Sequence, residues 1–193
     1  MFIDEETKLY LKKRISDNSL SHHSLSPEEL RKERLKQLKK DDLKGPDLHN
    51  VFEIEVGENE FSKFKLRVYV PSPINKHRDY PVILFFHGGG FVMGNLDTHD
   101  YSCRCIAKYS KKIVVAVDYR LAPENKFPVP LNDAKFVLKN LSQFPFPFNV
   151  DVENVIVCGD SAGGNLATVI AINGSYNLMP KEFFNNSIYT KEL

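Results

Sequence analysis

The sequence has no surplus of charge of one sign, no long apolar run and few cysteines. Its 193 residues include 26 basic and 25 acidic side chains, so the formal net charge is +1. This balance creates no field that would hold nucleic acid or an anionic membrane surface. No apolar stretch approaches the roughly 20 residues of a membrane span. We therefore expect neither a nucleic-acid-binding protein nor a membrane-spanning one.

The sequence has three cysteines, an odd number that is too small for a disulfide framework. They are Cys103, Cys105 and Cys158, and the acidic N-terminus (MFIDEE) lacks the apolar stretch of a secretory signal. Both features favour reduced thiols in a cytoplasmic protein. His99 lies close to Cys103 and Cys105, but this crowding does not match the usual structural zinc spacings. We expect these residues to pack near a helix and not to form a metal site.

Residues 1–45 are polar and are predicted to form a helical segment separate from the rest. Ser26 can cap a helix, Pro27 suits its first position, and Glu29 completes a capping box. The helix is expected to run to about Leu43, before a Gly-Pro pair. Basic and acidic residues alternate around it, which is typical of a solvated face.

Residues 46–193 are predicted to form a partial α/β domain. Alternating apolar and polar residues indicate an antiparallel strand pair, with one wet face, at 51–56 and 65–70. Three continuously apolar runs, at 82–86, 113–117 and 155–158, are typical of a parallel sheet covered by helices. The intervals predict helices at 98–110, 130–141 and from 161 to about 172, where Asn173-Gly174 follows. The expected order is two antiparallel strands followed by βαβαβα.

A G-x-S-x-G pentapeptide, Gly159 to Gly163, lies between an apolar run and a predicted helix. This is the context in which the motif forms a tight turn that exposes a nucleophilic serine. The glycines are needed where a side chain would clash, and the following helix directs its positive end at the site. Ser161 is therefore the candidate nucleophile. The alternative is an ordinary strand–turn–helix connection made of small residues.

Three glycines follow His87 directly after another apolar run. Such a loop lets backbone N–H groups approach a ligand closely, and in acyl transfer that ligand is the oxyanion of a tetrahedral intermediate. The predicted oxyanion site comprises His87, Gly88, Gly89, Gly90 and Ala162. Its donors are expected to be the N–H groups of Gly88, Gly89 and Ala162, with His87 orienting the loop. The alternative, a phosphate-binding loop, lacks the Lys-Ser/Thr or G-x-G-x-x-G pattern.

Taken together, these motifs resemble the GDXG family of lipolytic enzymes, also called the hormone-sensitive-lipase-like family. The resemblance covers about residues 45–172 and rests on the segments HGGGF at 87–91, GNLDTHD at 94–100, DYRLAPE at 118–124, FP at 127–128 and GDSAGGNLA at 159–167. It implies an α/β-hydrolase fold, hydrolysis of short or medium acyl esters, no cofactor, and an N-terminal helical cap. It also implies structural roles for Asp118, Arg120 and Asp133.

The sequence lacks a partner for the serine. A serine nucleophile needs a histidine base and an orienting carboxylate, which in this fold follow it along the chain. All six histidines precede Ser161, and no aspartate follows it. Residues 173–193 are also too few for the family's remaining strands, so the strand at 155–158 would become an edge. We expect a fragment or a truncated gene product of weak or no activity. The alternatives are a non-catalytic binding protein and a nonfunctional remnant.

Overall fold

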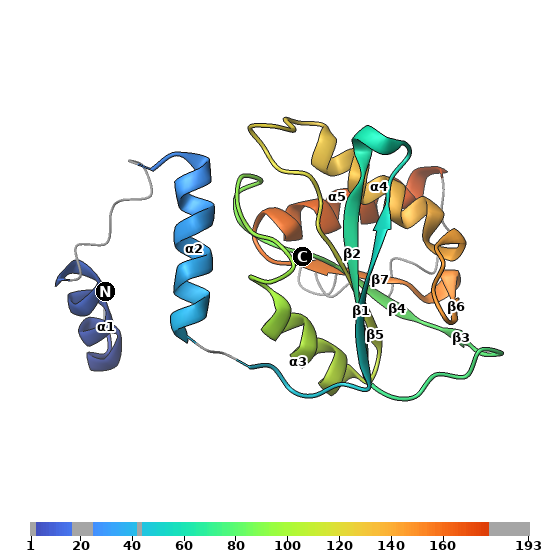
Figure 1. Cartoon of the computed structure of the whole chain (residues 1–193), viewed down its shortest axis with the longest axis horizontal. Helices are drawn as coiled ribbons and strands as arrows, with labels where there is room; N and C mark the ends of the chain where they lie inside the picture. The colour runs from blue at the N-terminus through green and yellow to red at the C-terminus, as the bar shows by residue number, and fades with distance from the viewer. Residues whose placement is uncertain (1–2, 17–24, 42–43, 178–193) are drawn as a thin grey trace.

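The computed structural model describes residues 3–16, 25–41 and 44–177. The first two elements are the helices α1 (Glu5–Ser16) and α2 (Pro27–Asp41). In Figure 1, α2 stands between α1 and the rest of the chain. The predicted capping box is present, because the Glu29 carboxylate accepts from the Ser26 N–H at 2.8 Å and the Glu29 N–H donates to the Ser26 hydroxyl at 3.3 Å.

A five-stranded mixed sheet forms the centre of the molecule, in the order β1-β2-β5-β4-β7. The antiparallel part and the parallel part match the predicted α/β arrangement. Within residues 44–177, β7 pairs only with β4, so it is an edge strand of this sheet, as expected for the run at 155–158. The strands are β1 (Asn50–Val56), β2 (Phe64–Val70), β4 (Val82–Phe86), β5 (Ile113–Val117) and β7 (Ile156–Gly159).

Three helices cover the sheet. Contacts place α3 (Asp100–Ser110) against β2 and β5, whereas α5 (Ala162–Asn177) packs on β4 and β7 and is joined there by α4 (Val129–Asn140) (Figure 1). Two boundary predictions were wrong. Helix α3 begins after His99, whose side chain makes no capping bond, instead of after Thr98 or Asp97. Helix α5 continues through Asn173-Gly174 to Asn177, so the glycine costs helix propensity without ending the helix.

Short elements that the sequence did not reveal connect the main ones. Two-residue strands β3 and β6 pair in parallel as a second sheet, and single 3₁₀ turns fill several connections. Runs this short carry no periodicity from which to predict them. Their bounds are β3 (Asp79–Tyr80), β6 (Asn149–Val150), η2 (Glu60–Ser62), η3 (Leu141–Gln143) and η4 (Val152–Asn154).

Two apolar cores lie on the opposite faces of the sheet. Leu84, Phe86 and Val115 belong to the larger core, with α4 and α5, and Ile83, Phe85 and Val114 belong to the core that includes Cys103 of α3. This alternation along β4 and β5 explains why both runs are continuously apolar. No helix in the described part of the chain combines the length and apolarity needed to cross a membrane.

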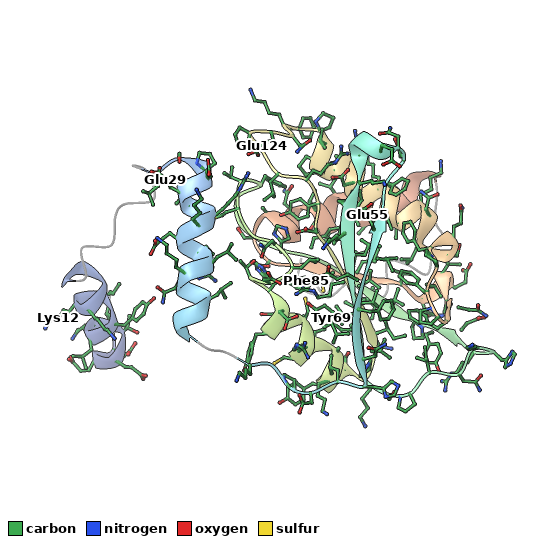
Figure 2. The ribbon with its side chains drawn as sticks, in the orientation of Figure 1. Lys12, Glu29, Glu55, Tyr69, Phe85 and Glu124 are labelled. Atoms are coloured by element: carbon green, nitrogen blue, oxygen red, sulfur yellow. The ribbon has the colours of Figure 1, made fainter. Side chains whose placement is uncertain are left out.

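The antiparallel pair has a wet face along only part of its length. Lys65 and Arg67 project from β2 toward Glu53 of β1, with nitrogen–oxygen distances of 2.9 and 2.6 Å. The next residue on that face, Tyr69, is fully buried, and its hydroxyl donates to Asp100 of α3 at 3.0 Å. Figure 2 labels Tyr69 at this position. The prediction of one wet face is therefore wrong beyond Arg67, because α3 covers it.

Candidate active site

The predicted nucleophile occupies a strained turn between β7 and α5. Ser161 has φ of +50°, a conformation that side-chain-bearing residues rarely adopt. The turn also brings the two chains very close: a Cβ on Gly163 would lie 1.9 Å from the Phe86 carbonyl oxygen, and one on Gly159 2.4 Å from the same atom. Only glycine fits at either position. Strain of this kind clusters at functional sites, and it leaves the Ser161 side chain exposed.

The glycine loop is attached to this turn through Asp160. The Gly88 N–H donates to Asp160 Oδ1 at 2.9 Å. A Cβ on Gly88 would lie 2.1 Å from Asp160 Oδ2, so the carboxylate fills the space that a side chain would need. Gly89 and Gly90 then have φ of +127° and +63° and turn the chain back on itself. Asp160 thus holds the start of the loop beside the nucleophile.

This bond changes the predicted set of oxyanion donors. Because the Gly88 N–H is already donated to Asp160, it does not point to an empty position. No group among the described residues accepts a hydrogen bond from the N–H of Gly89, Gly90 or Ala162. These three N–H groups are therefore the donors that remain free for a ligand. The expectation that Gly88 would donate to the oxyanion was wrong for this conformation.

His87 lies beneath the loop and is only 2% exposed. Its Nδ1–H donates to the Gly88 carbonyl at 2.8 Å, since a carbonyl oxygen can only accept. The Tyr119 hydroxyl donates to the His87 carbonyl at 2.6 Å, and the two rings stack with centroids 4.3 Å apart. Burial lowers the pKa of His87 to about 4. A neutral ring held on both sides suits the predicted orienting role.

No base contacts the nucleophile in the described part of the chain. Among those residues, no side chain forms a hydrogen bond with the Ser161 hydroxyl. The second nearby histidine, His99, has Nε2 3.2 Å from Asp160 Oδ1 and Nδ1 2.8 Å from the Thr98 hydroxyl. Both ring nitrogens of His99 are thus occupied. Neither His87 nor His99 is therefore placed to take the proton of the Ser161 hydroxyl in this structure.

The acidic and basic residues of the segment at 118–124 serve the scaffold. Arg120 donates to Asp133 through its guanidinium and through its backbone N–H, the latter at 2.9 Å. Asp133 is 2% exposed, so this pair is closed off from solvent on the carboxylate side. The pKa of Asp118 is raised to about 6, mainly by burial. None of the three contacts Ser161, which agrees with the predicted structural roles.

All three cysteines are free thiols. Cys103 and Cys158 are buried in the core under α3, and burial raises the pKa of Cys158 to about 12. His99 is turned toward Asp160. Within residues 3–16, 25–41 and 44–177, no three His, Cys, Asp or Glu side chains are arranged to hold a metal ion.

A cavity of about 700 Å³ lies between α2, the β1–β2 pair and the loops at 94–98 and 118–125. Charged side chains form much of its wall, including Arg31, Arg34, Lys63 and Glu124. Ser161 and the three consecutive glycines do not line it. The exposed serine therefore faces a different part of the surface.

Known proteins of the α/β-hydrolase fold resemble this chain in sequence and in structure. The sequence profile of an α/β-hydrolase-fold family, Abhydrolase_3, matches residues 83–180, just over half of the chain. The chain belongs to this family. The predicted resemblance to GDXG, hormone-sensitive-lipase-like enzymes is confirmed, and so is the fold class.

Three relatives illustrate the similarity to this α/β-hydrolase family. The esterase LipI of Mycobacterium tuberculosis is 47% identical over 105 residues, which are 54% of this chain and 33% of LipI. The carboxylesterase NlhH of the same species is 39% identical over 119 residues, covering 62% of this chain and 37% of NlhH. The structure of a hyperthermophilic esterase from Pyrobaculum calidifontis superposes with a TM-score of 0.76 at 34% identity, covering 90% of this chain and 54% of that one.

The matches cover only part of each relative. The chain spans about a third of the length of these curated relatives and about half of the esterase structure. The family profile itself covers the parallel strands of the five-stranded sheet, the glycine loop and the serine turn. The activity of the whole protein is a separate question.

Proposed function

We propose that this chain carries the nucleophile and the oxyanion site of a carboxylic-ester hydrolase. The observation that carries the proposal is the position of Ser161. Its strained turn exposes the side chain at the N-terminus of α5, while the N–H groups of Gly89, Gly90 and Ala162 have no acceptor among the described residues. An exposed serine beside unpaired N–H donors is the arrangement that acyl transfer needs.

The reaction follows from this arrangement. The Ser161 oxygen attacks the ester carbonyl carbon and loses its proton to a base, while the carbonyl oxygen takes up the electron pair and becomes an oxyanion. The N–H groups of Gly89, Gly90 and Ala162 stabilise that charge. Collapse of the intermediate breaks the bond to the leaving alcohol, which takes up the proton. Water then hydrolyses the acyl-enzyme and regenerates the serine.

The supporting parts have proposed roles of their own. The substrate is a small carboxylic ester, and no step requires a cofactor. Residues 1–45, with α1 and α2, form a helical cap beside the domain that begins at residue 46. His87 orients the loop from below, and Asp160 fixes the distance between loop and serine through the Gly88 N–H.

The lack of a base among the described residues favours a second candidate, a non-catalytic protein that binds an ester through the same donors. With the oxyanion donors and binding alone, an incomplete triad can still exceed the rate in water by about 10³–10⁴. We therefore expect weak turnover from the chain of 193 residues. We rank ester hydrolysis first because the strained, exposed Ser161 lies beside N–H groups that have no acceptor among the described residues.

A fluorophosphonate probe tests the proposal directly. We expect slow labelling of the purified chain at Ser161, with no labelling of Ser161→Ala or of the urea-unfolded chain. Absence of any labelling that depends on Ser161 would overturn the nucleophile assignment. If Ser161→Ala then bound a non-hydrolysable ester analogue, the binding function would be favoured. Labelling at the rate of a complete esterase would instead show that a base is present.

A further inference from the structure

The Arg31 side chain of helix α2 forms several hydrogen bonds with the body of the protein. Its Nε donates to the Val92 carbonyl at 2.7 Å, and its Nη2 donates to the Ala122 carbonyl at 2.8 Å. The same guanidinium forms a two-point pair with the Glu124 carboxylate, at 2.9 and 2.8 Å. Figure 2 labels Glu124 on the loop beside α2. Four hydrogen bonds from one planar group define its position closely.

The two carbonyl groups that Arg31 contacts belong to segments that already support the glycine loop. The N–H groups of Val92 and Met93 donate to the Gly89 carbonyl at 3.1 and 2.9 Å, closing the turn. The Ala122 N–H donates to the Phe91 carbonyl at 2.8 Å, which joins the second segment to the same turn. Arg31 therefore binds both of the segments that meet at this turn, one through the Val92 carbonyl and the other through the Ala122 carbonyl.

The glycine loop thus has an attachment at each end. Asp160 holds its beginning through the Gly88 N–H, and Arg31 holds its end through the Val92 carbonyl. Between them, Gly90 is exposed, and a Cβ placed there would meet no atom within 4 Å. His87 and the turn bonds to the Gly89 carbonyl also support the loop, and the contacts from Asp160 and Arg31 fix its two ends to the serine turn and to α2.

We propose that Arg31 is a positioning residue for the oxyanion site, through which docking of α2 sets the orientation of the Gly89 and Gly90 N–H groups. The name oxyanion site rests on the function proposed above, but the coupling between α2 and the loop does not. When α2 is displaced, the Val92 and Ala122 carbonyls lose their common donor and the loop loosens. The donors are then correctly aligned only while the helix is in place over the domain.

The competing explanation is that Arg31 matters only as the partner of Glu124 in a stabilising ion pair. The two explanations differ in which contacts of Arg31 the loop requires, the ion pair with Glu124 or the hydrogen bonds to the two carbonyls. Glu124→Gln removes the ion pair but leaves Arg31 free to donate to both carbonyls, whereas Arg31→Gln removes the donors to Val92 and Ala122 as well. Arg31→Lys keeps the charge, but a single ammonium group cannot reproduce the guanidinium fork.

Hydrogen exchange measured by mass spectrometry on the purified full chain separates these cases. We expect Arg31→Gln and Arg31→Lys to speed exchange in peptides covering 88–93 and 120–124 by roughly fivefold or more, the factor associated with losing a hydrogen bond. Glu124→Gln should change these peptides by less than roughly twofold. The matched control is Lys32→Gln, on the same helix, because Lys32 pairs with Glu28 one turn away and, among the described residues, with no group of the glycine loop. Peptides from β4 and β5 should be unchanged throughout.

Equal effects of Arg31→Gln and Glu124→Gln on the loop peptides would overturn the positioning role and leave an ion pair. Unchanged loop exchange in both Arg31 variants would overturn the coupling altogether. Faster exchange across the whole chain in Arg31→Gln would indicate general destabilisation. The test then rests on Arg31→Lys, in which faster exchange confined to the loop peptides supports the positioning role and unchanged loop exchange overturns it. Because exchange does not depend on the chemistry of Ser161, failure of fluorophosphonate labelling refutes the proposed function and leaves this measurement interpretable.

Discussion

Replacing His87 tests whether a buried, neutral imidazole really lies under the glycine loop. Its ring is 2% exposed, and its Nε2 has no hydrogen-bond partner among the described residues. Protonation would place a charge there with no acceptor to meet it, and burial accordingly lowers the pKa to about 4 from the ordinary 6.5. His87→Phe preserves a planar ring against Tyr119 and cannot be protonated, while His87→Gln keeps a polar group of similar reach.

The direction of the change in stability with pH follows from which state, folded or unfolded, binds the proton more tightly. With a depressed pKa in the folded state, the unfolded chain takes up the proton first, so His87 stabilises the fold above pH 6.5 and the contribution is lost as the pH falls toward 4. The loss amounts to about 1.4 kcal/mol at pH 5.5 and about 2.5 kcal/mol at pH 4.5. Other groups titrate in this range, so the useful quantity is the difference between native and variant chains at each pH.

Urea unfolding followed by circular dichroism at pH 7.5, 6.5, 5.5 and 4.5 measures this difference. We expect the free energy of unfolding of the native chain, relative to His87→Phe, to fall by about 2.5 kcal/mol between pH 7.5 and 4.5. The same decrease should appear relative to His87→Gln, because neither replacement titrates. Parallel pH profiles in all three proteins would refute the reasoning, since they would mean that His87 binds its proton equally well in the folded and unfolded states.

Two further substitutions test the scaffold around the serine, both by urea unfolding. Gly163→Ala should destabilise the fold by about 3 kcal/mol or more, because the new methyl group would lie 1.9 Å from the Phe86 carbonyl. Gly164→Ala, where the nearest atom is 3.1 Å away, should cost much less, and equal costs would contradict the close approach. Asp133→Ala should cost about 2–3 kcal/mol, because it leaves Arg120 without its buried partner. Asp133→Ala behaving like the surface change Lys32→Gln would contradict this account.

The fold could be predicted from the sequence where local pattern and tertiary environment agree. The apolar runs at 82–86 and 113–117 are buried on both faces, so their pattern alone indicated central strands. The capping box at Ser26 and Glu29 formed because its bonds are all local. The prediction for Tyr69 failed for the opposite reason. Whether an alternating strand has a wet face depends on what packs on it, and α3 comes from a distant part of the chain.

The site could be predicted only as far as its backbone geometry. Two glycine-rich motifs were sufficient to find Ser161 and the loop, since glycine marks positions where a Cβ cannot fit. The side-chain attachments were missed. Arg31 lies in a helix of alternating charges, and the sequence pattern for a solvated face is identical whether or not one guanidinium reaches the body 61 residues away. No local signal distinguishes that arginine from its neighbours.

Asp160 shows why the donors shift by one residue from those expected. A loop placed beside a serine turn must be held there, and the holding bond uses a backbone donor. Because the carboxylate adjacent to Ser161 takes the first available N–H, that of Gly88, the free donors begin at Gly89. At Gly90, φ of +63° is a backbone conformation that glycine adopts without the strain that a side chain would add. The run of three glycines is thus explained by one position for attachment and two for donation.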